Sequence, residues 1–179
     1  MATALALGDP VPSFELPDTA GENHAVPAPH GDPLATVLIQ TCNHCPYVIA
    51  WNPRLRAVAE EYGPRGVRFL AINSNNAASH PADSFERMVQ FVADHDWPIP
   101  YLYDEDQSVA RALGAETTPH VFVLDSAHAL AYRGAPDADH QDESQNAVWL
   151  RQALDAVLAG ETPAEAETQP RGCSVKWKT

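Results

Sequence analysis

The hydrophobic positions of the chain first outline two short buried strands with a helix between them. Residues 34–39 (LATVLI) and 67–73 (VRFLAIN) carry apolar side chains at both parities, which is the pattern of strands that are covered on both faces. Between them, apolar residues recur at helical spacing up to Gly63, at Leu55, Val58, Ala59 and Tyr62. These segments predict a β-α-β unit with a parallel crossover.

Downstream of this unit, the pattern predicts further alternating elements. A second helix is expected over about 84–95, where Asp83 and Glu86 resemble a capping box. A short strand at 101–103 and a short helix at 108–113 follow it. Helices that alternate with short strands are typical of an α/β domain.

The end of the chain divides into a hairpin, a last helix and a tail. Residues 120–125 (HVFVLD) and 129–134 (ALAYRG) are separated by a tight connection and predict a hairpin. The last helix ends at Gly160, and its apolar side is formed by Ala147, Leu150, Leu154, Val157 and Leu158. We expect one domain over residues 1–160 and a flexible linker and tail over 161–179, which have too few apolar residues to pack by themselves.

Composition agrees with a single domain and disfavours several classes of partner. With 179 residues, 45% of them hydrophobic, the chain can bury one core without disulfide staples. Its net charge of −13 disfavours nucleic acids and anionic membrane surfaces, since both would repel it. The start MATALALGDPVPSF has no basic residue, Arg54 being the first, and no apolar run approaches membrane-spanning length. We expect a cytoplasmic protein, in which three cysteines stay mostly reduced and a close pair indicates catalysis or metal binding.

Cys42 and Cys45 form such a pair, at the predicted junction between the first buried strand and the following helix. Open α/β sheets place their chemistry at this edge. Cys42 is expected to lie outermost in the turn and Cys45 in the first helical turn, where Pro46 suits an early position. The helix N-terminus favours a thiolate and can lower a cysteine pKa from about 8.5 to roughly 3.5–7.5. His44 can add a cation or a hydrogen-bond donor that stabilises the reduced form.

A metal site and an inert packed pair are the alternatives to redox exchange. A structural zinc site needs four ligands, of which one Cys-x-x-Cys supplies two. The other candidate ligands are scattered along the chain, at His24, His30, His120 and Cys173. We therefore favour redox exchange over a bound zinc or copper ion and assign no metal ligand.

Four stretches of the chain resemble one known family. These stretches are CNHCP after a strand, TTPHVFVLD further along, the opening LALGDPVPSFELPDTAG and the end GCSVKWK. They are similar to the thioredoxin superfamily, in its redoxin or peroxiredoxin-like (AhpC/TSA-like) branch that carries Cys-x-x-Cys. The resemblance implies a thioredoxin-like α/β fold, with a central mixed β-sheet flanked by helices, an N-terminal extension and an inserted strand and helix.

The same resemblance implies a thiol-disulfide oxidoreductase with an antioxidant or protein-thiol redox role and no cofactor. Cys42 would attack a substrate disulfide, and Cys45 would resolve the mixed disulfide. Pro119 matches the cis-proline that faces the motif, so that Thr118 can pair with a bound chain. The substrate would be a protein disulfide, a small disulfide or a peroxide, and a separate dithiol partner would return the site to its reduced state.

Departures from the family pattern keep other functions open. Thr41 stands where thioredoxins have an aromatic residue, and the strand lacks the acid that usually lies beneath the motif, so proton transfer must use another group or water. Peroxiredoxins instead carry Thr-x-x-Cys and an activating arginine; here Cys42 replaces the threonine, Cys45 resembles the peroxidatic cysteine, and no arginine matches. A thiol peroxidase that uses Cys45, and a metal-binding or redox-sensing module, are therefore the alternative functions.

Two further segments are candidates for the surroundings of the site. Cys173 is either a free tail thiol or an extra redox thiol that its flexible linker brings to the motif. Residues 73–84 (NSNNAASHPADS) either line the active-site edge or form a solvated loop. The sequence leaves both alternatives open.

Overall fold

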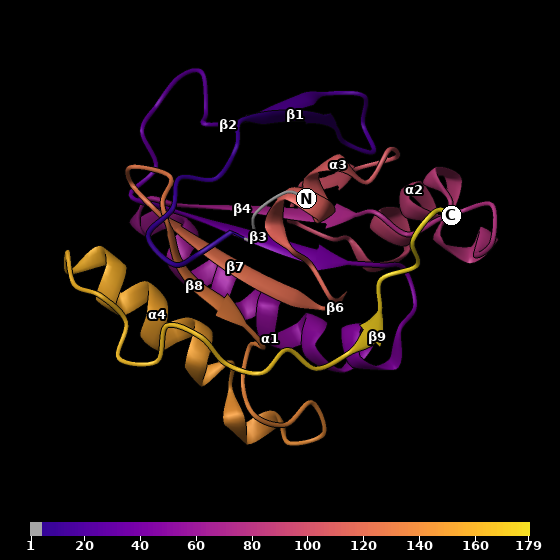
Figure 1. Cartoon of the computed structure of the whole chain (residues 1–179). Helices are drawn as coiled ribbons and strands as arrows, with labels where there is room; N and C mark the ends of the chain where they lie inside the picture. The colour runs from indigo at the N-terminus through magenta and orange to yellow at the C-terminus, as the bar shows by residue number, and fades with distance from the viewer. Residues whose placement is uncertain (1–4) are drawn as a thin grey trace.

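Five strands form a central mixed sheet in the order β5-β4-β3-β7-β8 (Figure 1). They are β3 (Ala35–Thr41), β4 (Val67–Asn73), β5 (Tyr101–Tyr103), β7 (His120–Asp125) and β8 (Leu130–Gly134). β4 pairs in parallel with β3 and β5, whereas β7 pairs antiparallel with β3 and β8. Every residue of β3 is buried, as expected for a central strand that packs on both faces. The predicted mixed sheet is confirmed.

The computed structural model describes residues 5–179. The expectations for the start of the chain include residues 1–4, which lie outside the described residues. Among the described helices, none is both long enough and apolar enough to cross a membrane.

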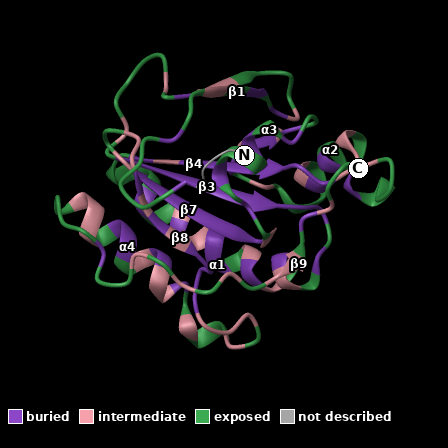
Figure 2. Cartoon of the chain, in the orientation of Figure 1, coloured by how far each residue is buried: buried purple, intermediate pink, exposed green. Residues whose placement is uncertain are grey.

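Helices cover both faces of the sheet. They are α1 (Pro46–Tyr62), α2 (Phe85–His95), α3 (Ser108–Leu113) and α4 (Val148–Leu158), together with the short 3-10 helices η1 (Gly63–Arg65), η2 (Pro81–Asp83) and η3 (Glu143–Gln145). One face of the sheet packs against α1, α2 and α4, and the other packs against α3 and the N-terminal segment. Adjacent strand residues point to opposite faces, so Val37 and Leu38 of β3 belong to different clusters. The strands of the sheet are accordingly buried along most of their length (Figure 2).

The N-terminal extension is a hairpin of β1 (Phe14–Pro17) and β2 (Asn23–Val26). One carboxylate holds its turn, since Asp18 Oδ1 accepts hydrogen bonds from the backbone N–H groups of Ala20 and Glu22 at 2.8 and 2.9 Å. Buried Leu16 and Val26 attach the hairpin to the same face of the sheet as α3.

The start of α2 differs from the expected capping box. Ser84 is the N-cap, and its hydroxyl accepts a hydrogen bond from the backbone N–H of Arg87 at 3.3 Å. Asp83 ends η2, is buried and turns towards the Cys-x-x-Cys turn. A serine directly before the helix can reach an unpaired N–H, which leaves the neighbouring carboxylate for other contacts.

The C-terminal segment packs against the domain, in contrast to the expected flexible tail. Thr168 forms backbone contacts with Arg133 of β8. Further on, β9 (Cys173–Ser174) pairs antiparallel with β6 (Thr117–Thr118). Val175 is 4% exposed and joins the core cluster beneath α3. Pairing with a strand provides hydrogen-bond partners for the backbone N–H and C=O groups, so a segment with few apolar side chains can still attach to the domain. The domain boundary at residue 160 stays a prediction.

A buried ion pair ties the loop before α4 to α1. Asp137 accepts hydrogen bonds from the Arg54 guanidinium at 2.8 and 3.0 Å and from the Trp51 indole N–H at 2.9 Å. It also accepts the backbone N–H of Ala147 at 2.9 Å, next to the first turn of α4. This carboxylate is fully buried, so no water can replace it as the hydrogen-bond acceptor of its partners.

Asp137→Ala is expected to lower the free energy of unfolding by about 3–5 kcal/mol, because it leaves the Arg54 charge buried without a partner. Chemical denaturation followed by circular dichroism measures the change. Glu60→Ala, which removes an exposed carboxylate of α1, is the matched control and should change stability by less than about 0.5 kcal/mol. A similar small loss for both variants would contradict the assigned role of the ion pair.

Candidate active site

The two motif cysteines lie where β3 ends and α1 begins. β3 ends at Thr41, Cys45 is the N-cap of α1, and Pro46 is its first residue. Cys45 therefore lies one position before the helical turn in which we expected it. Cys42 and Cys45 are 4% and 3% exposed, so both are buried to the same extent and the outer position of Cys42 stays a prediction. Both are free thiols, as is Cys173.

Thr118 contacts both motif sulfurs. Its peptide bond to Pro119 is cis, as the family resemblance implied. The Thr118 hydroxyl lies 3.4 Å from the Cys42 sulfur, and its carbonyl oxygen lies 3.4 Å from the Cys45 sulfur. The edge of β6 thus forms one wall of the dithiol site.

Cys45 is the sulfur that this environment favours as a thiolate. Its pKa is lowered to about 4, chiefly because the Cys42 thiol donates a hydrogen bond to it. Burial opposes the shift, but the Cys173 thiol and the backbone N–H groups of Val48 and Cys173 add further donors. The N-terminus of α1 also favours negative charge at the N-cap.

The pKa of Cys42 is shifted in the opposite direction. The pKa of Cys42 is raised chiefly because its proton is held in the interaction with the Cys45 sulfur, and secondly because the thiol is buried. The Asp83 carboxylate raises it further, since it repels a negative charge on Cys42. One proton is therefore shared by two sulfurs, and it resides on Cys42.

Asp83 is a site residue that the sequence analysis did not assign. Its carboxylate accepts the backbone N–H of Asn43, within the motif, and the side-chain amide of Asn75, both at 2.9 Å. Asn73 donates to the Asp83 carbonyl oxygen at 2.8 Å. The two ends of the polar segment 73–84 therefore line the active-site edge with buried groups, whereas residues 78–82 are exposed. The only signal in the sequence was the run of amide and acid side chains directly after a buried strand.

His44 lies on the outside of the motif turn. Its side chain is 60% exposed, and its Nδ1 atom lies 3.8 Å from a carboxylate oxygen of Asp83. We expected His44 to support the thiolate directly. In this arrangement its influence on the sulfurs passes through Asp83, whose negative charge a protonated imidazole partly offsets.

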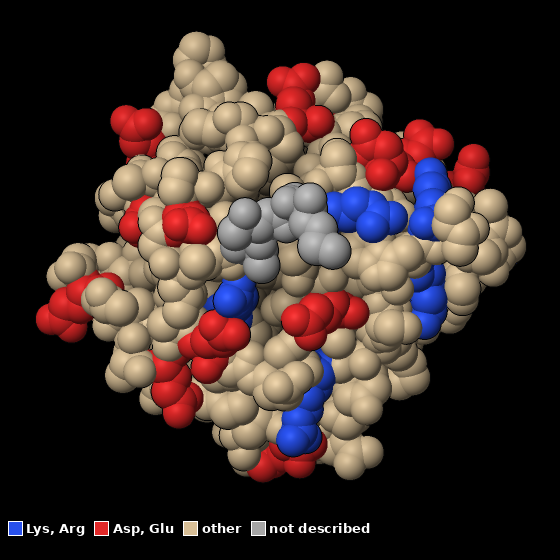
Figure 3. Space-filling view, viewed as in Figure 1, with Lys and Arg blue, Asp and Glu red and all other residues tan. Residues whose placement is uncertain are grey.

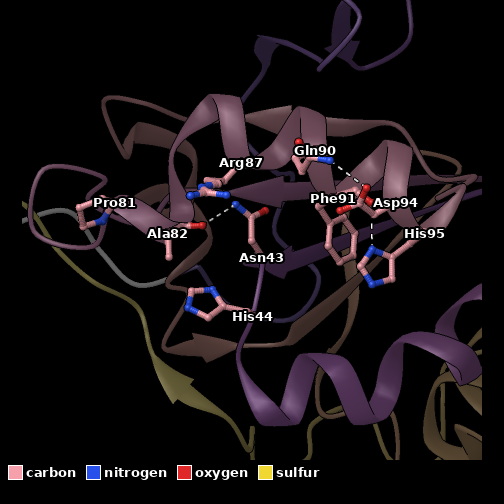
Figure 4. A pocket seen from close by; sticks show the side chains of 9 residues that line it. All are labelled: Asn43, His44, Pro81, Ala82, Arg87, Gln90, Phe91, Asp94 and His95. Atoms are coloured by element: carbon pink, nitrogen blue, oxygen red, sulfur yellow. Dashed lines mark hydrogen bonds between the residues drawn. The ribbon is translucent and has the colours of Figure 1, made fainter.

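An open pocket of about 360 Å³ lies beside the motif turn, between Asn43, His44 and α2 (Figure 4). The Asn43 amide faces this pocket and donates to the Ala82 carbonyl oxygen at 2.9 Å, while its oxygen accepts from the Tyr101 hydroxyl at 2.9 Å. Arg87 lines the pocket from the side of α2. The pocket gives small polar molecules a place next to the motif, although neither motif sulfur lines it.

The candidate metal ligands lie apart from one another. Among residues 5–179, the three-residue group of possible ligands is Asp18, Glu22 and His24, which belongs to the turn of the N-terminal hairpin. His120 is buried, and burial lowers its pKa to about 4, with a smaller contribution from the Arg133 charge. Its Nδ1 accepts the backbone N–H of Glu116 at 3.2 Å, which is a structural role.

Solved structures with the same architecture extend over nearly the whole chain. A hypothetical protein from Sinorhizobium meliloti 1021 is 32% identical, with a TM-score of 0.91, and the match covers 99% of this chain and 97% of that one. An uncharacterized conserved protein from Geobacillus kaustophilus is 38% identical, with a TM-score of 0.88 and coverage of 97% and 93%. A peroxidoxin, BcpB, from Mycobacterium tuberculosis shares the fold at 19% identity, with a TM-score of 0.65 and coverage of 87% and 97%. No curated protein gave a significant sequence match.

The central mixed sheet, with the two cysteines at the junction of β3 and α1, has a thioredoxin-like fold. Residues 6–148 match the Redoxin family, and the chain belongs to that family. Family membership supports a thiol-disulfide redox function.

The assignment of the thiolate to Cys45 predicts a pH profile. Alkylation of Cys45 by iodoacetamide should be half-maximal near pH 4, because its pKa is lowered to about 4 and only the thiolate reacts. Reactivity is thus present above that pH and lost below it. Peptide mapping by mass spectrometry follows each cysteine, and Cys173, whose pKa is raised to about 11 by burial and by Cys45, is the internal control. A midpoint for Cys45 above pH 8 would rule out the thiolate.

Asp83→Asn should lower the pKa of Cys42 by about one pH unit, because it removes the negative charge that opposes ionisation. The shift is best measured in Cys45→Ser/Cys173→Ser protein, in which Cys42 is the sole thiol. His44→Ala should give a smaller change in the opposite direction. Asp94→Asn, on the exposed side of α2, is the matched control. An unchanged Cys42 titration in Asp83→Asn protein would remove Asp83 from the site.

Proposed function

We propose that the protein is a thiol-disulfide oxidoreductase in which Cys42 and Cys45 cycle between a dithiol and a disulfide. The observation that carries the proposal is the position of the two free thiols, which both contact Thr118 at the N-terminus of α1, where the pKa of Cys45 is lowered. Such a pair has one nucleophile already deprotonated and a second thiol next to it, as disulfide exchange requires. Membership of the Redoxin family supports the same chemistry.

We assign the first attack to Cys45, the reverse of the order that the family resemblance implied. The Cys45 thiolate attacks one sulfur of the substrate disulfide, forms a mixed disulfide and releases the other sulfur as a thiolate. Cys42 then loses its proton and attacks the Cys45 sulfur, which releases the second substrate thiolate. The lowered pKa of Cys45 and the raised pKa of Cys42 support this order.

The same cycle explains how Cys42 becomes reactive in the second step. Once Cys45 is bound in the mixed disulfide, its negative charge is gone, and with it the largest cause of the raised pKa of Cys42. Asp83, whose charge acts on Cys42, is our candidate for the proton acceptor. A dithiol partner then reduces the Cys42–Cys45 disulfide, so the cycle needs no bound cofactor.

The charge distribution supports disulfide or peroxide substrates over nucleic acids. The net charge is −13, and acidic side chains are spread over the face shown in Figure 3, whereas basic ones gather mainly on the side near the C-terminus. A surface of this sign repels a phosphate backbone.

Peroxide reduction at Cys45 is the second candidate, favoured by the lowered pKa of that residue. The thiolate would attack one peroxide oxygen, the O–O bond would break with release of water or an alcohol, and Cys45 would become a sulfenic acid. The Cys42 thiol would then attack the Cys45 sulfur and form the disulfide with loss of water. Among the described residues, no arginine hydrogen-bonds to either motif sulfur. We therefore expect peroxide oxidation to be slower than disulfide exchange, since the leaving oxygen lacks electrostatic stabilisation.

Two variants in a Cys173→Ser background separate the roles of the motif cysteines. With a model disulfide at pH 6, Cys42→Ser/Cys173→Ser should keep the fast first attack and accumulate a stable mixed disulfide at Cys45. Cys45→Ser/Cys173→Ser should react about 100-fold more slowly, because its remaining thiol is mostly protonated at that pH. Stopped-flow absorbance gives the rates, and mass spectrometry locates the adduct.

The Cys173→Ser protein, with both motif cysteines, is the positive control and should end with a Cys42–Cys45 disulfide. A fast reaction trapped at Cys42 would restore the order that the resemblance implied. Absence of any Cys42–Cys45 disulfide would refute the oxidoreductase proposal. Peroxide added to the Cys42→Ser/Cys173→Ser protein, with sulfenic-acid trapping, tests the second candidate, which fast oxidation of Cys45 would favour.

A further inference from the structure

The C-terminal segment lies along the strand edge that forms one wall of the dithiol site. β9 pairs with β6 in the register Thr117 with Ser174 and Thr118 with Cys173 (Figure 1). The backbone N–H of Val175 continues the pairing by donating to the Glu116 carbonyl oxygen at 3.1 Å. Thr118 is the residue that contacts both motif sulfurs. A segment paired with it therefore lies directly against the site.

Side chains of the domain hold this segment in place. Lys176 donates its backbone N–H to the Asn75 side-chain oxygen at 2.9 Å, and its carbonyl oxygen accepts from the Gln107 amide at 2.9 Å. Gln107 is fully buried, and its amide also donates to the Ser74 carbonyl oxygen at 2.7 Å, which fixes the side chain that holds the segment. Its side-chain oxygen accepts the backbone N–H of Lys178 at 2.9 Å.

The sequence of the segment also fits the strand edge closely. A Cβ atom at Gly172 would lie 2.1 Å from the Thr118 carbonyl oxygen, so only glycine permits this approach. The next residue, Cys173, packs against the cluster formed by Cys42, Cys45 and Val48. Its strand partner is Thr118, whose carbonyl oxygen lies 3.4 Å from the Cys45 sulfur. The tail therefore presents a third thiol to the motif cysteine.

We propose that Cys173 is a third redox thiol, held by the docked segment at the position of a peptide substrate, and that it exchanges disulfides with Cys45. The proposal rests on the proposed oxidoreductase function and deepens it. An exposed strand edge next to a reactive site is where an extended peptide would add. Here the edge of β6 is filled by residues of the same chain. While the tail is docked, a peptide substrate cannot pair with β6. The site then accepts small-molecule disulfides, which do not need to pair with a strand.

The exchange needs no external oxidant or reductant. The Cys173 thiolate attacks the Cys45 sulfur of a Cys42–Cys45 disulfide, the Cys45–Cys173 bond forms, and Cys42 leaves as the thiolate. The proton that Cys173 loses is matched by the one that Cys42 gains. In the same way, Cys173 can resolve a mixed disulfide between Cys45 and a small thiol, which releases that thiol.

The titration of Cys173 supports this order of events. In the reduced protein its pKa is raised to about 11, first by burial and then by its hydrogen bond to the negatively charged Cys45 sulfur. Bonding of Cys45 to another sulfur removes that charge. Cys173 therefore becomes easier to ionise at the step in which it has to attack.

A stoichiometric reaction of Cys42→Ser protein tests the proposal. Reduced, dilute protein is mixed with one molar equivalent of 5,5′-dithiobis(2-nitrobenzoate). We expect two equivalents of thionitrobenzoate to be released. Mass spectrometry should find a monomer that carries no thionitrobenzoate adduct and has a Cys45–Cys173 disulfide. Cys42→Ser/Cys173→Ser should release one equivalent and keep the adduct at Cys45, a twofold difference in yield.

One released equivalent from Cys42→Ser protein, with a stable adduct and a free Cys173, would overturn the proposal, as would a disulfide between two chains. The Cys173→Ser variant distinguishes a failure of the Cys173 proposal from a failure of the proposed oxidoreductase function. If it still releases two equivalents through a Cys42–Cys45 disulfide, only the role of Cys173 is lost. If it does not, the motif pair itself is not a redox couple.

A substitution away from the sulfurs tests whether docking brings Cys173 to the site. Gly172→Ala in the Cys42→Ser protein should slow the second release about tenfold or more, because a displaced segment lowers the effective concentration of Cys173 at Cys45. Arg171→Ala, an exposed neighbour, is the matched control and should leave the rate unchanged. Equal rates for the two variants would show that the strand pairing does not position the thiol.

Discussion

One buried negative charge, on the Cys45 sulfur, organises this site. A thiolate that is only 3% exposed has little water around it, so the protein must supply hydrogen-bond donors. The groups that lower the pKa of Cys45 belong to three separate parts of the chain, namely Cys42 in the motif turn, Val48 in α1 and Cys173 in β9. The helix N-terminus, the strand-helix turn and the C-terminal segment therefore depend on one another through a single atom.

The fold keeps the two motif sulfurs in different states by placing a second negative charge on one side only. Asp83 is buried next to the motif turn, and its charge disfavours a thiolate at Cys42. Two adjacent thiols in identical surroundings would compete for one proton on equal terms. With donors around Cys45 and a carboxylate acting on Cys42, the proton has one preferred position. In the cycle that we propose, this asymmetry makes Cys45 the nucleophile and Cys42 the resolving thiol.

The sequence was sufficient to predict the elements whose signals are local. The strands at 35–41 and 67–73 carry apolar residues on both faces, and the helix after Pro46 has its apolar stripe at regular spacing, so pattern alone located the strand-helix junction and its cysteines. The hairpin at 120–134 followed from two short strand-like runs, HVFVLD and ALAYRG, around a tight connection.

The parts that depend on distant contacts had no such signal. Asp83 looked like a helix cap because its partners, Asn43 and Asn75, are polar residues that only the folded chain brings to it. The segment after residue 160 looked unable to pack because its attachment is through backbone pairing with the two residues of β6 and through Gln107. A two-residue strand has no periodicity to detect, and the register is fixed by the folded partner.

The contacts around Cys45 also link the redox state of the protein to the attachment of its C-terminal segment. Cys173 packs against Cys45, and this contact is strongest while Cys45 carries a negative charge, since charged acceptors bind donors more tightly than neutral ones. Oxidation of Cys45 removes this charge and weakens that part of the attachment. By linkage, docking of the segment must favour the thiolate as much as the thiolate favours docking. The strand pairing of β9 with β6 involves no sulfur, so it retains the segment near the site when the charge is lost, and Cys173 stays within reach of the bond that forms at Cys45.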